Sequence, residues 1–159
     1  MVPIIAYNYG AGHKDRVIKT IKHSVAYGVG IMFVGLLAMH IFPAQLMRMF
    51  DAEESLIAIG APALETISLS FVFAGFCIVA GSVFQALGNG VYSMIVSVAR
   101  QMCVLLPVAK LLSLSGEVTL IWWAFPIAEL ASVLLTSYFL VRIYRKVICH
   151  IGEPVVQDA

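Results

Sequence analysis

Charged residues are absent from long stretches of the chain, and the longest of these stretches organises the rest. Residues 66–99 contain no Asp, Glu, Lys or Arg. One helix crosses a bilayer with roughly 20 residues, so this stretch is long enough for most of two helices. Glycine closes helices and lets the chain reverse. The pattern therefore predicts a transmembrane hairpin whose turn is Gly88, Asn89 and Gly90, with both glycines in conformations that β-branched residues resist.

The alternation of apolar runs and charged segments along the whole chain predicts an all-α membrane protein with four transmembrane helices. Polar and charged residues interrupt the apolar runs near residues 13–22, 48–54, 113–117 and 142–146. The expected organisation is a cytoplasmic lead-in and basic loop at 1–22, a transmembrane portion at 23–146 and a cytoplasmic tail at 147–159. The spans within the middle portion are predicted at about 24–43, 64–87, 92–112 and 118–141.

Local signals predict how the second span begins. Asp51 and Glu54 have the spacing of a capping box, which predicts a helix start at this point. That helix is expected to run into the second span, and Pro62 is expected to bend it.

Two further prolines predict kinks in the later spans. Pro107 and Pro126 each remove a backbone donor, which would leave the carbonyls of Cys103 and Trp122 short of their usual helical bonds. Broken helices recur at transporter sites, although kinks without a function are also common.

Small residues along the first span predict where helices approach closely. Gly28, Gly30 and Gly35 fall within it, and small residues permit close contact between membrane helices. The alternative is that membrane helices are simply richer in glycine.

Composition agrees with a membrane protein and limits its partners. The 159 residues are 61% hydrophobic and 12% charged, whereas soluble domains are about a quarter charged. The mean hydropathy is +0.96. The net charge of +1 indicates nothing about partners, and no basic tract suggests a nucleic-acid partner. The high hydrophobicity makes the bilayer the expected surrounding.

Metal and catalytic signatures are absent from the sequence. Cys77, Cys103 and Cys149 are widely spaced and form no CxxC motif, so they are interpreted as packing residues rather than metal ligands. The sequence has no recognisable nucleophile–base pair or phosphate-binding loop. We therefore expect neither a metal site nor an enzyme.

The distribution of charge predicts the orientation of the four spans. Four spans place both termini on one side, and this side carries seven basic residues whereas the other carries only Arg48. Cytoplasmic loops collect Lys and Arg. We expect a multi-pass protein of the cell membrane with both termini and Asn89 in the cytoplasm and Glu53 outside.

Four polar residues within the spans are candidates for a substrate or ion pathway: Glu129, Arg100, Gln101 and Gln85. Charges in the hydrocarbon cost several kcal/mol, so they usually face protein or water. Glu129 is too deep to reach the surface, and it is either paired structurally or part of a transport pathway. Arg100 either serves the pathway or extends to the cytoplasmic surface.

Four segments carry a resemblance to the multidrug and toxic compound extrusion (MATE) family. They are PIIAYNYGAG (3–12), FPAQLMRMFDAEES (42–55), GSVFQALGNGVYSMIVSVARQ (81–101) and WWAFPIAEL (122–130). Their order resembles the last four helices of a twelve-helix, two-lobe transporter. The resemblance implies export of organic, often cationic, compounds in exchange for protons or sodium.

The resemblance also implies that helices of the family are missing from this chain. The acidic cation-site residues of the family lie on helices that are missing here or at positions without an acid, so the coupling-ion site is expected outside this chain, and no other cofactor is expected. The expected partners are the bilayer, an organic substrate, and the missing helices or another membrane subunit. The main interpretation is a fragment of a drug:cation antiporter. The alternatives are a non-transporting membrane remnant or partner module, and a portion of a related lipid-linked sugar flippase.

Overall fold

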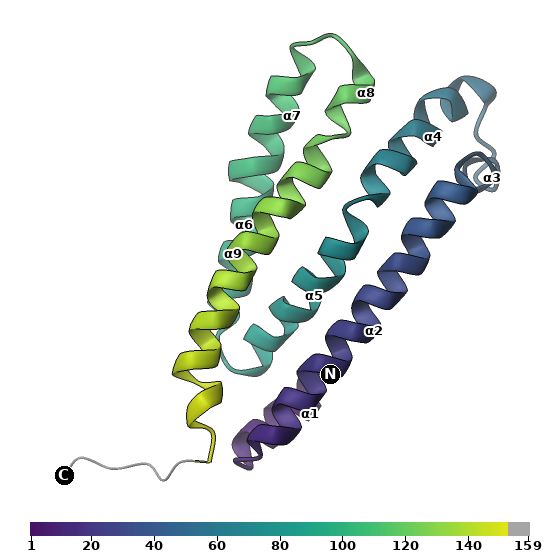
Figure 1. The fold of residues 1–159 in the computed structure, drawn as a ribbon. Helices are drawn as coiled ribbons and strands as arrows, with labels where there is room; N and C mark the ends of the chain where they lie inside the picture. The colour runs from purple at the N-terminus through teal and green to yellow at the C-terminus, as the bar shows by residue number, and fades with distance from the viewer. Residues whose placement is uncertain (153–159) are drawn as a thin grey trace.

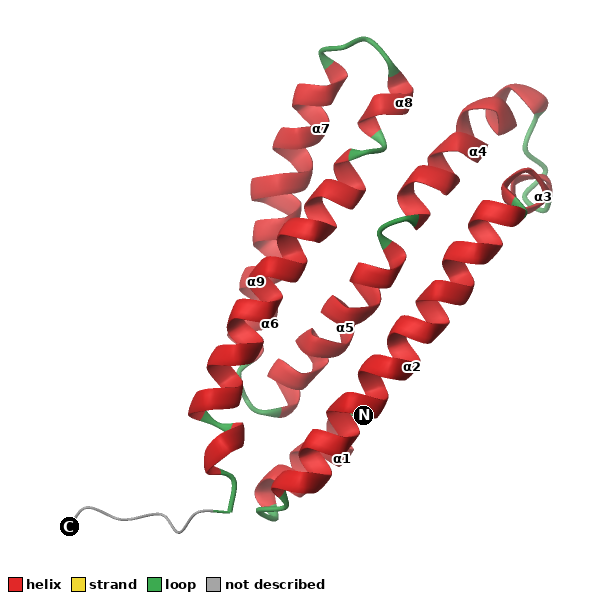
Figure 2. Cartoon of the chain, viewed as in Figure 1, coloured by secondary structure: helices red, strands yellow, loops and turns green. Residues whose placement is uncertain are grey.

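The computed structural model describes residues 1–152, and helices account for every regular element among them. The all-α prediction is confirmed. Figures 1 and 2 show the arrangement. The elements in chain order are α1 (Val2–Gly10), α2 (Lys14–Ile41), α3 (Pro43–Arg48), α4 (Glu54–Ser68), α5 (Phe71–Ala86), α6 (Gly90–Val98), the π-helix η1 (Ala99–Leu105), α7 (Leu106–Ser113), α8 (Val118–Ile121), α9 (Ala124–Lys146) and the 3-10 helix η2 (Ile148–His150).

The long helices lie lengthwise and alternate in direction. Figure 1 shows the α5–α6 turn at the same end as α1 and η2, while α3 and the α7–α8 connection lie at the other end. Three helical stretches are long and apolar enough to cross a membrane, namely 14–41, 90–113 and 118–150. The pair α4 and α5, bent by 54°, provides a fourth if it crosses as one span.

The predicted basic loop before the first span is wrong, because it is helical. α1 occupies Val2–Gly10, and α2 begins at Lys14, so the basic residues up to Lys22 form its first turns. Gly12, at φ +72°, separates the two helices. Lys and Arg are good helix formers, and no proline interrupts them before Pro43. The polar pattern therefore does not mark the helix boundary.

The capping box predicted at Asp51 is also wrong. Asp51 lies outside the helix with φ 53°, and α4 begins at Glu54 without a side-chain cap. The carboxylate of Glu54 instead accepts a hydrogen bond from Nη2 of Arg48 at 3.2 Å. The Arg48 pairing and the left-handed backbone of Asp51 replace the predicted reciprocal cap.

The bend in the second span occurs between α4 and α5 rather than at Pro62, which lies inside α4. The Ser68 hydroxyl donates to the carbonyl of Glu65 at 2.8 Å, and the Ser70 hydroxyl donates to that of Ile67 at 2.6 Å. Serine hydroxyls that bond to the preceding turn compete with the helical ladder. The two serines therefore account for the break.

The two later prolines are accommodated by local changes of hydrogen-bond register. Before Pro107 the helix widens into η1, where the N–H of Leu106 bonds to the carbonyl of Gln101. Pro126 cannot give the carbonyl of Trp122 its usual helical bond, and this carbonyl accepts instead from the N–H of Phe125 at 3.2 Å. The interruption near Pro126 falls just before it, at the α8–α9 junction.

The turn of the hairpin is a Schellman motif. The N–H of Asn89 bonds to the Phe84 carbonyl at 2.8 Å, and the N–H of Gly88 to that of Gln85 at 3.1 Å. Gly88 has φ +76°, as the motif requires. Gly90 begins α6 without a positive φ, and an added Cβ would meet its nearest neighbour at 4.0 Å. The prediction of a backbone conformation that β-branched residues resist is therefore confirmed for Gly88 and wrong for Gly90.

The first and second spans approach closely at two glycines. A Cβ on Gly75 of α5 would lie 3.0 Å from the carbonyl oxygen of Gly28, and a Cβ on Gly28 would lie 2.7 Å from Val79. Gly35 is in ordinary contact with Phe71, whereas Gly30 has nothing within 4 Å. Close packing is confirmed at Gly28 but not at Gly30.

The hydrophobic core lies at the end of the bundle that holds the Gly88 turn. The buried side chains come from α1, α2, α5, α6, α9 and η2, and the largest are Phe84, Ile5, Ile143 and Ile148. The Lys14 ammonium group joins α2 to this end by donating to the carbonyl of Cys149 at 2.8 Å. The predicted tail at 147–159 thus begins with packed residues, and 153–159 lie outside the described residues.

Candidate functional site

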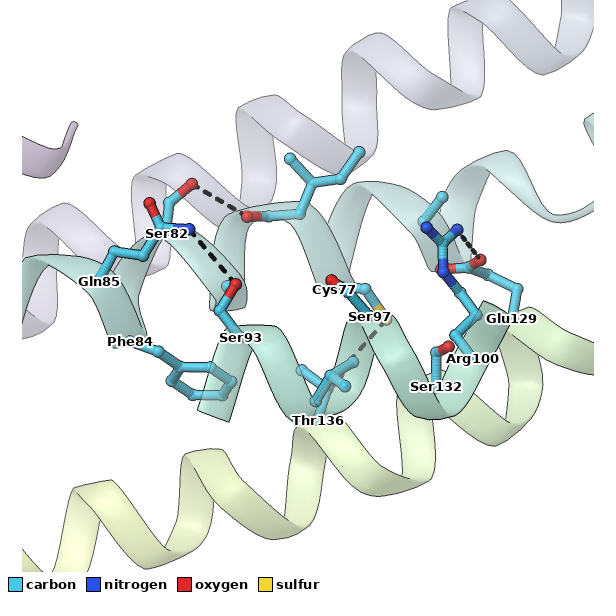
Figure 3. A pocket seen from close by; sticks show the side chains of 14 residues that line it. Cys77, Ser82, Phe84, Gln85, Ser93, Ser97, Arg100, Glu129, Ser132 and Thr136 are labelled. Carbon is cyan, nitrogen blue, oxygen red and sulfur yellow. Dashed lines mark hydrogen bonds and ion pairs between the residues drawn. The ribbon is translucent and has the colours of Figure 1, made fainter. Parts of the chain in front are cut away.

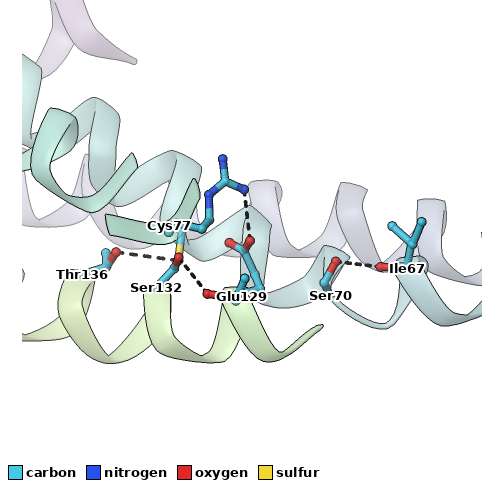
Figure 4. Close-up of polar contacts among 8 residues, drawn as sticks. Ile67, Ser70, Cys77, Glu129, Ser132 and Thr136 are labelled. Carbon is cyan, nitrogen blue, oxygen red and sulfur yellow. Dashed lines mark hydrogen bonds and ion pairs between the residues drawn. The ribbon is translucent and has the colours of Figure 1, made fainter. Parts of the chain in front are cut away.

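An ion pair joins two of the predicted pathway residues. Nη1 of Arg100 lies 3.2 Å from Oε2 of Glu129 (Figure 3), and Figure 4 shows Glu129 on the same helix as Ser132 and Thr136. The side chain of Glu129 is 7% exposed, whereas that of Arg100 is 44% exposed. The carboxylate is therefore held within the bundle, and the guanidinium reaches from it to the surface.

The backbone on each side explains how these residues meet. Arg100 is the second residue of η1, and π-helical turns occur often at functional sites. Glu129 lies on the buried face of α9 with Ser132 and Thr136. The Ser132 hydroxyl donates to the Ala128 carbonyl at 3.0 Å.

A polar cavity of about 310 Å³ extends along the bundle beside this pair, between α5, α6, η1 and α9 (Figure 3). Thr136 Oγ1 and Cys77 Sγ are 3.7 Å apart within it. At its other end, Nε2 of Gln85 donates to the hydroxyl of Ser93 at 3.3 Å. The remaining polar side chains of the lining are Ser82, Ser97, Ser132, Arg100 and Glu129.

A second cavity, of about 350 Å³, shares the ion pair. Arg100, Glu129 and Ala74 line both cavities, so the pair lies where the two cavities meet. The second cavity also contacts Gln101 and is otherwise mostly apolar, with Met32, Phe71, Leu105 and Phe125 in its lining.

The side chains around the ion pair can bind a ligand by hydrogen bonds and charge, but they include no group arranged to make or break a covalent bond. Hydroxyls and an amide line the polar cavity, and one buried carboxylate stands at its end. Such a carboxylate can pair with Arg100 or face another cation. Among residues 1–152, no three His, Cys, Asp or Glu side chains gather as metal ligands would.

All four predicted pathway residues line one of the two cavities: Gln85, Arg100 and Glu129 the first, and Gln101 the second. The sequence reading missed the hydroxyls. Their signal was present as helical spacing, because Ser93 and Ser97 precede Arg100 by seven and three residues, and Ser132 and Thr136 follow Glu129 by three and seven. Residues with these separations share one face of a helix.

Comparison with known proteins relates the chain to a protein family. Residues 1–111 match the family model described as MatE. Searches of curated proteins and of solved structures found no match.

Proposed function

Because the chain belongs to the MatE family of membrane transporters, we propose that its four spans form part of the second lobe of a multidrug efflux transporter. In this proposal they act with the other helices of a two-lobe assembly. The transported compounds are organic and often cationic, and their export is coupled to inward movement of protons or sodium. The Arg100–Glu129 pair beside a polar cavity carries the proposal.

The pair is proposed to belong to the substrate pathway because a buried carboxylate is a costly way to join two helices. Desolvating such a charge costs several kcal/mol, and apolar side chains often pack in its place as stably. Charged residues within membrane spans commonly mark pathways. The hydroxyls of Ser132 and Thr136 on the same face of α9 extend a polar lining that hydrocarbon packing does not require.

Orientation is the first testable part of the proposal. We propose that Asn89 and both termini are cytoplasmic and that Glu53 is outside, because Lys and Arg gather at the end with the Gly88 turn. Cysteine introduced singly at position 53 or 89, in a background without native cysteines, is expected to react with a membrane-impermeant reagent from opposite sides. Labelling of position 53 only from the cytoplasm would reverse the assignment.

The pathway role is tested in a chimera in which residues 14–147 replace the corresponding helices of a MatE-family efflux transporter. We expect the chimera to restore cationic-dye efflux to an efflux-deficient host. Glu129→Gln is expected to lower the initial rate about tenfold, because an interaction with a charged group is lost. Rates are compared at equal amounts of protein in the membrane.

The matched control is Glu117→Gln, which changes an exposed acid in the α7–α8 connection. It is expected to leave efflux unchanged, and equal rates for both variants would remove Glu129 from the pathway. The chain expressed alone is expected to insert without supporting efflux, because alternating access needs two bodies that move about a shared site. Efflux by the chain alone would refute the two-lobe proposal.

A further inference from the structure

A basic hollow lies on the exposed face of α9 close to its C-terminal end. It has a volume of about 290 Å³ and is lined by Tyr138, Val141, Arg142, Arg145 and Lys146. All five side chains are exposed. Their separations of three, four, seven and eight residues place them on one side of the helix. Three cations therefore converge on one surface concavity.

No acidic side chain neutralises these cations among residues 1–152. The ion pairs in this part of the chain are Arg48–Glu54 and Arg100–Glu129. Asp15 is the one acid in the described segments that meet at this end, 1–24, 85–93 and 136–152. The guanidinium of Arg142 lies 6.0 Å from the ring centroid of Tyr92 on α6, which helps to orient it. The hollow is thus suited to an anion.

An apolar stripe continues from the hollow along α9. Leu130, Leu134, Tyr138 and Val141 are 50%, 75%, 58% and 51% exposed. Successive members are three or four residues apart, so they form a row on one side of the helix. The row leads from the cations towards the middle of the span. An occupant with an anionic head and an apolar tail would satisfy both parts of this surface.

We propose that the hollow binds the phosphate headgroup of an anionic phospholipid, with an acyl chain along the stripe. Arg142 and Arg145 offer the forked donors that match phosphate oxygens, and Lys146 adds a further positive charge. Basic pockets at the cytoplasmic ends of membrane helices bind such headgroups in other proteins. The stripe favours a lipid over free phosphate. The inference does not depend on the proposed transport function.

The test measures phosphatidylglycerol binding to the purified full chain in detergent micelles by native mass spectrometry, with phosphatidylcholine as the neutral comparison. The wild-type chain is expected to retain phosphatidylglycerol preferentially. Arg142→Gln, Arg145→Gln and Lys146→Gln together are expected to weaken binding at least tenfold, since each basic residue near a membrane surface contributes about fivefold. The matched control changes Arg16, Lys19 and Lys22 of α2 to Gln and is expected to retain the preference.

Equal losses in the two triple variants would indicate diffuse attraction to the basic end and overturn the site. Full competition by inorganic phosphate would overturn the lipid assignment in favour of a free-anion site. If the α9 triple variant does not fold, as judged by circular dichroism, Arg145→Gln alone is used. It is expected to weaken phosphatidylglycerol binding about fivefold, and wild-type binding by this variant would refute the proposal.

Discussion

Arg100→Gln is expected to lower the free energy of unfolding by about 3 kcal/mol, because it leaves the buried carboxylate of Glu129 without its partner. Glu129→Gln is expected to cost only about 1 kcal/mol, since the side chain of Arg100 is 44% exposed and long enough to extend its guanidinium towards the membrane interface. The unequal burial of the two groups thus predicts an unequal cost. Equilibrium unfolding in mixed micelles, followed by the fluorescence of Trp122 and Trp123, measures both.

The double variant and a surface pair complete this experiment. Arg100→Gln with Glu129→Gln is expected to be more stable than Arg100→Gln alone, because no unpaired charge remains. Arg48→Gln breaks an ion pair whose side chains are 62% and 81% exposed, so it is expected to cost less than about 1 kcal/mol. Equal costs for Arg100→Gln and Glu129→Gln would show that the buried carboxylate does not depend on Arg100.

Gly75→Ala is expected to destabilise the chain by about 2 kcal/mol, because the new methyl group would overpack the contact between α2 and α5. Its Cβ would lie 3.0 Å from both the carbonyl oxygen of Gly28 and Cγ of Met32. A backbone oxygen cannot move aside as a flexible side chain can, so the helices must separate. The same mixed-micelle unfolding measurement reports the loss.

Gly30→Ala provides the matched control on α2. A Cβ at this position has no heavy atom within 4 Å, and alanine favours helix over glycine by up to about 1 kcal/mol. Stability is therefore expected to be unchanged or slightly raised. A similar loss for Gly75→Ala and Gly30→Ala would mean that glycine content, rather than the contact at Gly28, determines the packing.

The sequence predicted the helical class and the hairpin turn because both depend on local signals. Apolar runs identify membrane helices, and Gly88 supplies the conformation that ends α5. The start of α2 was misplaced because charge marks where the membrane ends and not where helical hydrogen bonding ends. The bend between α4 and α5 was attributed to Pro62, because the competing bonds of Ser68 and Ser70 depend on side-chain rotamers that a sequence pattern does not specify.

The residues of the candidate site were predicted one by one, without the contacts that join them. The depth of Glu129 in the last span singled it out, but its partner depends on which helices are neighbours and on how η1 rotates Arg100. Gln85 and Ser93 are hydrogen-bonded across the hairpin. This contact follows from the position of the turn, which lies between the two residues. The meeting of Cys77 and Thr136 joins α5 to α9, and no local pattern indicates that contact.

Because the hydrophobic core lies at one end of the bundle, the helices can rotate about that end. The largest fully buried side chains, Phe84, Ile5 and Ile143 among them, lie near the Gly88 turn, whereas α3, α7 and α8 contain no buried residue. α2, with 28 residues, is roughly 40 Å long at the usual helical rise. A rotation of about 5° at the packed end would carry its far end by roughly 4 Å over this length. Small adjustments among Phe84, Ile143 and their neighbours would therefore displace the opposite end of the bundle by several ångströms, with α2 and α5 moving together because they are packed at Gly28 and Gly75.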